Sequence, residues 1–359
     1  MIPNTHTATN TTQNNHTSTL LNGACPTTNR LAVLLMLTVG QEQPPWAEFN
    51  NGTRSPIRAV AFTPDGELLV SGDKEMVRVW RLDNREPVAV MDAKDVRCIA
   101  VSKDSKWIAA GTSWGEMRVW DRQTFKEVLR QDKELDGHTI TSLDFSPDAP
   151  TRLLVASGNR KPCIWDVATR KKMFTLREHL NWVIAAKFSP RGDRIATATF
   201  HEHIQIYDSR NGNLIVTIES AKVTPYYNTG LLWSDNGNNI LILSNNAIKR
   251  IALSTKSVVE EWSVEDGNHP CIVSPVSGEF VLCSTGYDIL LFNPSSSNQA
   301  RGPEVQLPYD AQSIAVSPDG QFLAIGEGDG KVVVKRSQAG PNHKRTQVLG
   351  RQSKTQLKS

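Results

Sequence analysis

Cysteine is scarce in this sequence, which has five in 359 residues, widely spaced and without a Cys-x-x-Cys pair. This usage is typical of reduced thiols rather than of a disulfide-stapled secreted domain. The longest apolar run, residues 31–39, is far shorter than the roughly 20 residues of a membrane-spanning helix. It also begins too late for the core of a secretory signal. We therefore expect no membrane partner and a cytoplasmic or nuclear location, or both.

An excess of charge of one sign is missing too, since 40 Lys and Arg stand against 37 Asp and Glu. The balance is uneven along the chain. Residues 335–359 hold seven bases and no acid, whereas residues 54–334 hold 32 bases and 35 acids. A nucleic-acid surface needs Lys and Arg concentrated in the fold itself. We therefore expect nucleic acid to be bound, if at all, only by the basic C-terminal tail.

A turn sequence that follows a hydrophobic segment recurs seven times, as in Phe62-Thr-Pro-Asp-Gly66 and Val316-Ser-Pro-Asp-Gly320. The Ser or Thr residues of the copies are 39 to 45 residues apart: Thr63, Ser102, Ser146, Ser189, Ser234, Ser274 and Ser317. This spacing is close to the ~40 to 45 residues of a propeller blade.

Each copy also has the pattern of a four-stranded sheet. In the first, residues 57–62 alternate before the Pro-Asp-Gly turn, residues 68–71 and 77–80 form apolar segments, and a fourth strand is expected near 87–90. One such sheet cannot bury both faces alone, so the copies must stack around a ring. We predict an all-β fold, a seven-bladed β-propeller of four-stranded antiparallel blades.

The third strands of four copies end in an aromatic residue, in Val79-Trp80-Arg81, Val119-Trp120-Asp121, Ile164-Trp165-Asp166 and Ile206-Tyr207-Asp208. On these residues the sequence resembles the WD-repeat family of β-propellers over about 54–336. The resemblance implies a hydrogen-bonded tetrad of His, Ser or Thr, Asp and Trp within a blade. The family's Gly-His dipeptide occurs only as Gly137-His138, and the fourth copy has Glu178-His179. We therefore expect no repeat to hold a complete tetrad.

The repeats also set the predicted domain boundaries. We assign residues 31–336 to the propeller and predict that the Thr- and Asn-rich residues 1–30 and the basic residues 337–359 are disordered. The last blade needs an outer strand. The family's usual solution is the N-terminus, here residues 31–39 or 46–49, and residues 346–349 are the alternative.

Three motifs imitate catalytic or ligand sites. Gly111-Thr-Ser113-Trp-Gly115 matches a hydrolase nucleophile elbow, which requires a strand followed by a helix, but strands are expected on both sides here. His201 and His203 offer two imidazoles without a third ligand nearby. Residues 326–331 imitate a phosphate loop but lead into a strand. We expect no enzyme, cofactor or metal site, with a propeller enzyme built from scattered loop residues as the less favoured alternative.

In an up-and-down blade, the turns between second and third strands share one rim with the loops between blades. Aromatic residues and Arg in such loops are typical of interface hot spots. The candidates on this rim are Lys74, Trp114, Arg160, Lys161, Trp182, His201, Tyr226 and Tyr227. The aromatic ones can instead pack between blades. Trp114 is the best candidate for exposure, because it replaces an acidic turn residue.

These residues predict a protein or peptide partner whose identity the sequence does not reveal. We expect a non-enzymatic scaffold or adaptor. The family resemblance leaves open a recognition or core subunit of a ubiquitin-ligase, chromatin or RNA-processing complex.

Overall fold

The structure is a computed structural model that describes residues 46–132, 137–177, 179–200, 203–219, 230–234, 236–244, 247–263, 271–273, 281–284, 288–292, 305–306 and 310–336. Contacts divide the chain into two units, Met1–Leu34 and Leu35–Ser359, and every described residue belongs to the second. The segments predicted to be disordered, 1–30 and 337–359, lie outside the described residues, as do 31–39 and 346–349.

The described strands form seven four-stranded antiparallel sheets, which we call blades 1 to 7 in chain order. Blade 1 is β2 (Ala59–Phe62), β3 (Leu68–Gly72), β4 (Met76–Arg81) and β5 (Pro87–Asp92). Blade 2 is β6 (Val96–Val101), β7 (Trp107–Thr112), β8 (Met117–Asp121) and β9 (Glu127–Gln131). Blade 3 is β10 (Ile140–Phe145), β11 (Arg152–Ser157), β12 (Cys163–Asp166) and β13 (Lys171–Thr175).

The remaining four blades follow the same order of strands. Blade 4 is β14 (Val183–Phe188), β15 (Arg194–Thr199), β16 (Ile204–Asp208) and β17 (Leu214–Ile218). Blade 5 is β18 (Leu231–Trp233), β19 (Asn239–Ser244), β20 (Ala247–Ala252) and β21 (Ser257–Ser263). Blade 6 is β22 (Cys271–Val273), β23 (Val281–Ser284), β24 (Asp288–Phe292) and β25 (Val305–Gln306). Blade 7 is β26 (Ala311–Val316), β27 (Phe322–Glu327), β28 (Lys331–Arg336) and β1 (Ala47–Asn50).

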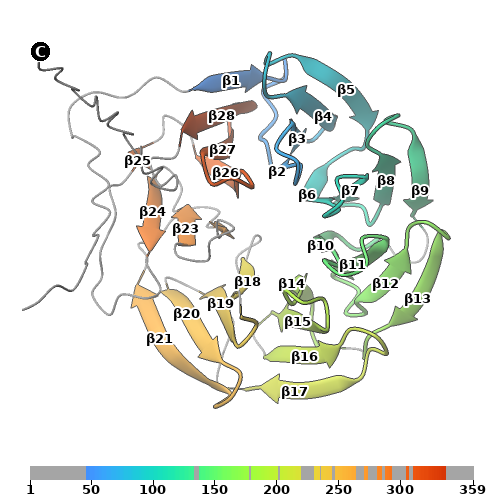
Figure 1. Ribbon diagram of the computed structural model, residues 1–359, viewed down its shortest axis with the longest axis vertical. Helices are drawn as coiled ribbons and strands as arrows, with labels where there is room; N and C mark the ends of the chain where they lie inside the picture. Colours follow the sequence, from blue (N-terminus) through green and yellow to red (C-terminus); the bar gives the residue numbers. More distant parts are fainter. Residues whose placement is uncertain are drawn as a thin grey trace, which may run out of the picture. The chain divides into compact units, whose positions relative to one another are not determined.

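The blades succeed one another around a ring (Figure 1). The first strand of each blade contacts the first strand of the next, from β2 through β6, β10, β14, β18 and β22 to β26, which contacts β2 again. An all-β fold of four-stranded antiparallel blades is therefore confirmed.

The ring is closed by β1, which comes from the N-terminal side of the repeats. It pairs antiparallel with β28, with Ala47 opposite Val334 and Asn50 opposite Lys331. The strand, Ala47–Asn50, overlaps residues 46–49, one of the two N-terminal segments predicted to supply the outer strand of the last blade. Phe49 from β1 is buried, with its ring centroid 5.4 Å from that of Trp80 in blade 1. One short strand therefore joins the last blade to the first.

The recurring Ser/Thr-x-Asp-Gly turn has a physical reason. The Thr63 hydroxyl donates to Asp65 Oδ1 at 2.6 Å and accepts a 3.0 Å bond from the Leu68 N–H. Ser102 makes the same pair of bonds with Asp104 and with the Trp107 N–H. A buried hydroxyl therefore satisfies the backbone where the second strand begins.

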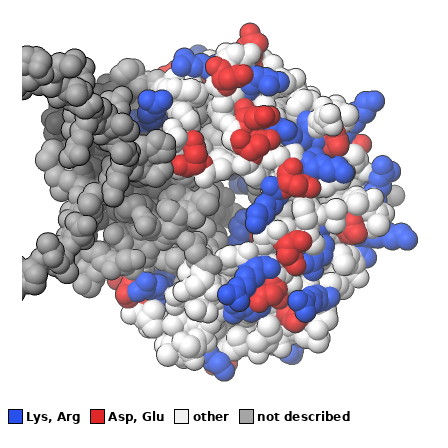
Figure 2. Space-filling view, viewed as in Figure 1, with Lys and Arg blue, Asp and Glu red and all other residues white. Residues whose placement is uncertain are grey.

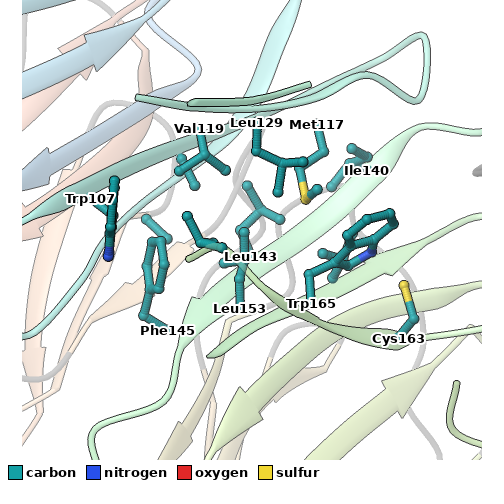
Figure 3. Close-up of a cluster of buried hydrophobic side chains, with 14 residues drawn as sticks. Trp107, Met117, Val119, Leu129, Ile140, Leu143, Phe145, Leu153, Cys163 and Trp165 are labelled. Carbon is teal, nitrogen blue, oxygen red and sulfur yellow. The ribbon is translucent and has the colours of Figure 1, made fainter. Parts of the chain in front are cut away.

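The hydrophobic core lies between blades as well as within them. Figure 3 shows one such cluster, in which Val119 and Leu129 of blade 2 pack with Leu143, Leu153 and Trp165 of blade 3. Burial of apolar surface stabilises each pair of neighbours by about 25 cal/mol per Å². Such clusters join blade 7 to blade 1 and each pair of neighbours from blade 1 to blade 5, so this part of the ring supplies a rigid base for the loops at its rims.

A buried ion pair lies where blade 1 meets the closing segment. Asp73 Oδ2 accepts 2.6 Å hydrogen bonds from Arg78 Nη1 and from Asn51 Nδ2. Its other oxygen accepts bonds from the N–H groups of Glu75 and Met76. The carboxylate is thus fully satisfied, and it fixes the β3–β4 turn against the residues that follow β1.

Candidate interaction face

The candidate face consists of the turns between second and third strands and the loops between blades. Backbone hydrogen bonds join these segments to one another. In the β3–β4 turn, the Lys74 carbonyl accepts a 2.8 Å bond from the Asp95 N–H in the loop between blades 1 and 2. The Asp95 carbonyl accepts a 2.9 Å bond from the Ser113 N–H in the β7–β8 turn. The loop is therefore held on both sides.

The same connection continues into blades 3 and 4. The Ser113 carbonyl accepts a 3.0 Å bond from Thr139 Oγ1, and the Thr139 carbonyl accepts one of the same length from the Gly158 N–H. Farther on, the Trp182 carbonyl accepts a 2.9 Å bond from the Phe200 N–H. We call this surface the loop face: the described residues of 73–75, 93–95, 112–116, 132–139, 158–162, 176–182 and 200–203. Its side chains project from segments that are fixed relative to one another.

Trp114 is the most prominent aromatic residue on the loop face, with 68% of its surface exposed. Thr112 Oγ1 accepts hydrogen bonds from the N–H groups of Trp114 and Glu116 at 3.3 and 3.0 Å. Gly115 has φ +78°, and a side chain there would lie 3.0 Å from the His138 carbonyl oxygen. The backbone of this turn is therefore closely packed and constrained, and the turn exposes the Trp114 indole to solvent.

Leu180 and Trp182 form a second apolar region, 83% and 46% exposed respectively. The Trp182 ring packs against Phe200, with 6.3 Å between the ring centroids. A methyl group on Gly158 would lie 3.7 Å from Trp182 and 3.6 Å from His138, so these side chains flank the β11–β12 turn. Trp182 therefore packs on one side and is open on the other.

A buried histidine holds the loop that carries these residues. His179 Nε2 lies 2.9 Å from Thr197 Oγ1 and 3.2 Å from the Tyr207 hydroxyl. The backbone N–H of His179 donates a 2.9 Å bond to the Arg160 carbonyl. Burial lowers the pKa of His179 to about 4, so the imidazole is neutral at physiological pH. Because Leu180 follows directly, this anchor fixes where the exposed leucine leaves the blade.

Five of the eight predicted site residues lie on the loop face and are exposed: Lys74, Trp114, Arg160, Lys161 and Trp182. His201, Tyr226 and Tyr227 lie outside the described residues.

Sequence reasoning overlooked further exposed residues of the face, namely Leu180, Lys94, Arg177, Glu75 and Asp132. A leucine in a short loop has no periodic pattern to mark it as exposed. The available signal is its position between buried His179 and Trp182.

Charges of both signs are interspersed on the blades. Figure 2 shows basic and acidic side chains side by side over one side of the described ring. Near the loop face, Asp95 pairs with Arg58, and Arg118 Nη1 lies 2.9 Å from Asp92 Oδ2. Glu116 Oε2 also forms an ion pair with Arg118 Nε, at 3.3 Å. Several acids close to this face are thus already neutralised by neighbouring arginines.

Two of the motifs that imitate catalytic or ligand sites, residues 111–115 and 326–331, lie at the turns between second and third strands. Residues 111–115, the possible nucleophile elbow, connect β7 to β8, so a strand stands where the elbow needs a helix. Cys98 and Cys163 are free, and burial raises the pKa of Cys98 to about 12, far from that of a reactive thiol. Within the described ranges, no three His, Cys, Asp or Glu side chains are grouped as metal ligands would be.

In the part of the chain that the structure describes, no helix has the length and apolarity that crossing a bilayer requires.

Comparison with known proteins agrees with this architecture. The family described as "WD domain, G-beta repeat" matches residues 47–81, 85–121, 129–166 and 170–208. The chain is similar to WD repeat-containing protein 1 of Rattus norvegicus, 27% identical over 213 residues that cover 56% of this chain and 34% of the relative. It is 24% identical to actin-interacting protein 1 of Drosophila melanogaster over 251 residues, 64% of this chain and 40% of that protein.

A shorter similarity joins the chain to ribosome assembly protein 4 of Saccharomyces cerevisiae, 34% identical over 92 residues, which are 25% of this chain and 18% of the relative. The chain thus spans well under half the length of these relatives. The four repeat matches, the aromatic ends of the third strands and the four-stranded antiparallel blades agree with one another: the chain belongs to the WD-repeat family.

Proposed function

We propose that this chain is a non-enzymatic scaffold or adaptor that binds a protein or peptide through the loop face of blades 1 to 4. The observation that carries the proposal is the exposure of three large apolar side chains, Trp114, Leu180 and Trp182, on one hydrogen-bonded surface. Exposed apolar groups cost solubility unless a partner covers them. Tryptophan in particular buries a large area on binding for little lost conformational entropy.

The rigid base supports the same proposal. Preorganised contact residues lose less entropy on association, which leaves more of the contact energy as affinity. Arg160 and Lys161 stand on the β11–β12 turn between the two apolar regions, because Gly158 in this turn packs beside Trp182 and His138. Cations at the edge of an apolar contact increase specificity and the rate of association.

The test is affinity purification with mass spectrometry on the full chain and on a double variant, Trp114→Ala with Arg160→Ala. We expect specific partners to be lost from the double variant. A matched control is Ile215→Ala with Lys171→Ala, which removes an exposed apolar side chain and an exposed cation from outer strands. If the double variant kept the same partners as the wild-type chain, the proposal would be contradicted. Loss of the same partners from the control would also count against it.

The names of the relatives suggest which partners to test directly. Actin is one, since a relative over 64% of this chain is called actin-interacting protein 1. Ribosome precursors are another, given the similarity to ribosome assembly protein 4. Co-sedimentation with filamentous actin and co-purification with ribosomal particles separate these from ubiquitin-ligase or chromatin assemblies.

A further inference from the structure

The outer strand of blade 3, β13, is the least buried of the outer strands in blades 1 to 5 and 7. Four of its five residues are exposed, and the other, Phe174, is half-buried. The outer strands of blades 1, 2, 4, 5 and 7 each contain at least one buried residue. Segments with few buried apolar contacts open locally at a lower free energy than the rest of a fold. β13 can therefore leave the edge of its sheet while the ring stays folded.

A basic run leads into this strand. Its residues, Arg170, Lys171 and Lys172, are all exposed. They lie five, four and three residues before Thr175, which is exposed as well. Many protein kinases select a Ser or Thr hydroxyl by bases at such positions, which an acidic cleft of the kinase binds when the substrate segment is extended. A β-strand already has an extended backbone. Asp166 lies opposite Lys171, at the end of β13 that is far from Thr175.

Two exposed cations flank Thr175 on the same face of the sheet. Thr175 lies opposite Cys163 on β12, and a 2.8 Å bond from the next N–H to the Pro162 carbonyl continues the pairing. Arg177 is two residues beyond Thr175, and Lys161 is two residues before Cys163. Side chains two residues apart on a strand project from the same face, and diagonal neighbours across a pair of strands are within reach of long side chains. A phosphate on Thr175 would therefore lie within reach of both cations.

We propose that Thr175 is a phosphorylation site for a kinase that recognises upstream basic residues, and that Lys161 and Arg177 hold the phosphate. In the transfer, Thr175 Oγ1 attacks the γ-phosphorus of a nucleoside triphosphate. The Oγ1–P bond forms, the bond from this phosphorus to the bridging oxygen breaks, and the nucleoside diphosphate leaves. The hydroxyl proton passes to the catalytic base of the kinase. The product adds a charge of roughly −1.5 to −2 at the edge of the loop face. The inference stands apart from the proposed function, since it needs no partner on that face.

The first experiment incubates the full chain with ATP and a panel of purified protein kinases that prefer upstream bases, and tandem mass spectrometry locates the phosphate. We expect Thr175 to be the main site on blade 3. Thr169 is the internal control, because it is exposed beside the same basic run but residues 163–168 before it contain no base. Lys171→Ala with Lys172→Ala should lower the initial rate at Thr175 about tenfold or more, the effect of losing hydrogen bonds to charged groups.

The matched control for these lysines is Lys103→Ala with Lys126→Ala, which removes two exposed lysines of blade 2. Its rate at Thr175 should stay within about twofold of wild type, as expected for surface changes outside a contact. A melting temperature for each variant separates lost recognition from lost folding. Absence of phosphate from Thr175 with every kinase, or equal rates at Thr169 and Thr175, would overturn the proposed site. So would an unchanged rate in the Lys171→Ala, Lys172→Ala variant.

The second experiment follows the phosphorus NMR signal of the phosphorylated chain against pH. Cations beside a phosphate lower its second pKa, which is ordinarily about 6. We expect a lower pKa in wild type and a return toward the ordinary value in Lys161→Ala with Arg177→Ala, whereas Lys103→Ala with Lys126→Ala should match wild type. Glu178 follows Arg177 in the sequence, outside the described residues, and its charge opposes this effect. Equal pKa values in wild type and the Lys161→Ala, Arg177→Ala variant would overturn the role of the two cations.

Discussion

His179 Nε2 and Thr197 Oγ1 lie 2.9 Å apart in the interior of blade 4, and both residues are buried. The bond joins the loop between blades 3 and 4 to the second strand of blade 4. It thereby links the folding of the blade to the position of Leu180 and Trp182.

Replacing Thr197 by Val should therefore destabilise the protein. The variant keeps the shape of the side chain and removes the hydroxyl, so a buried imidazole nitrogen loses its closest partner. The expected loss is about 1 to 3 kcal/mol of unfolding free energy, toward the lower end because the Tyr207 hydroxyl is 3.2 Å away. Urea denaturation measures it, with Thr217→Val on β17 as the control. Equal stability of wild type and Thr197→Val would mean that the bond contributes nothing measurable.

The two histidines of the repeat signature show where sequence comparison was informative and where it was not. Gly137-His138 is the family dipeptide, yet His138 is exposed, and His179, preceded by Glu, is the buried one. The sheet register gives the reason. In blade 4, Thr197 pairs with Gln205. At the same register position of blade 3, Val155 pairs with Cys163, so blade 3 has no hydroxyl there. The dipeptide alone cannot reveal that difference.

The closing strand yields a second prediction. Phe49 is buried against Trp80, whereas its neighbour Glu48 is exposed on the other side of β1. Phe49→Ala should cost about 3 to 5 kcal/mol through lost burial and the cavity left behind. Glu48→Ala should change stability by no more than about 0.5 kcal/mol. Thermal unfolding of both variants provides the comparison, and similar losses would contradict the alternation observed in β1.

The repeats in the sequence were sufficient to predict the blades, because the turn between first and second strands is a local structure. Thr63, Ser102 and Ser317 each donate to the Asp two residues later and accept a bond from the N–H five residues later. The closing strand was less certain from the sequence. Ala47–Asn50 is a short segment more than 280 residues from β28, and its pairing depends on the completed ring. The loop face was predicted only by position on a rim, since exposure of Leu180 depends on contacts that no local pattern encodes.

Glu327 gives the protein a pH dependence. The carboxyl is buried at the end of β27, and burial, followed by the charge of Asp329, raises its pKa to about 7, with Glu48 acting in the same direction and Lys331 and Lys335 opposing. The folded state therefore holds a proton that the unfolded state releases near pH 4.5. The stability from this group is fully present below about pH 4.5 and is lost as the pH rises through about 7.

Glu327→Gln removes this titration. At pH 8 the variant should exceed wild type in stability, by at most about 3 kcal/mol from 1.36 kcal/mol per pKa unit. The advantage should disappear near pH 4.5. Urea denaturation at both pH values measures it, with Glu75→Gln, at an exposed position, as the control. The same difference between wild type and Glu327→Gln at both pH values would contradict the raised pKa.

The exposure of Trp114 predicts that its role is separable from folding. Trp120, in the adjacent strand β8, is 3% exposed and packs in the core between blades 1 and 2. Trp120→Ala should cost about 3 to 5 kcal/mol, and Trp114→Ala about 0.5 kcal/mol or less. Thermal unfolding separates the two. If Trp114→Ala lowered stability as much as Trp120→Ala, the indole would have to be part of the core, and the loop face would lose its principal anchor.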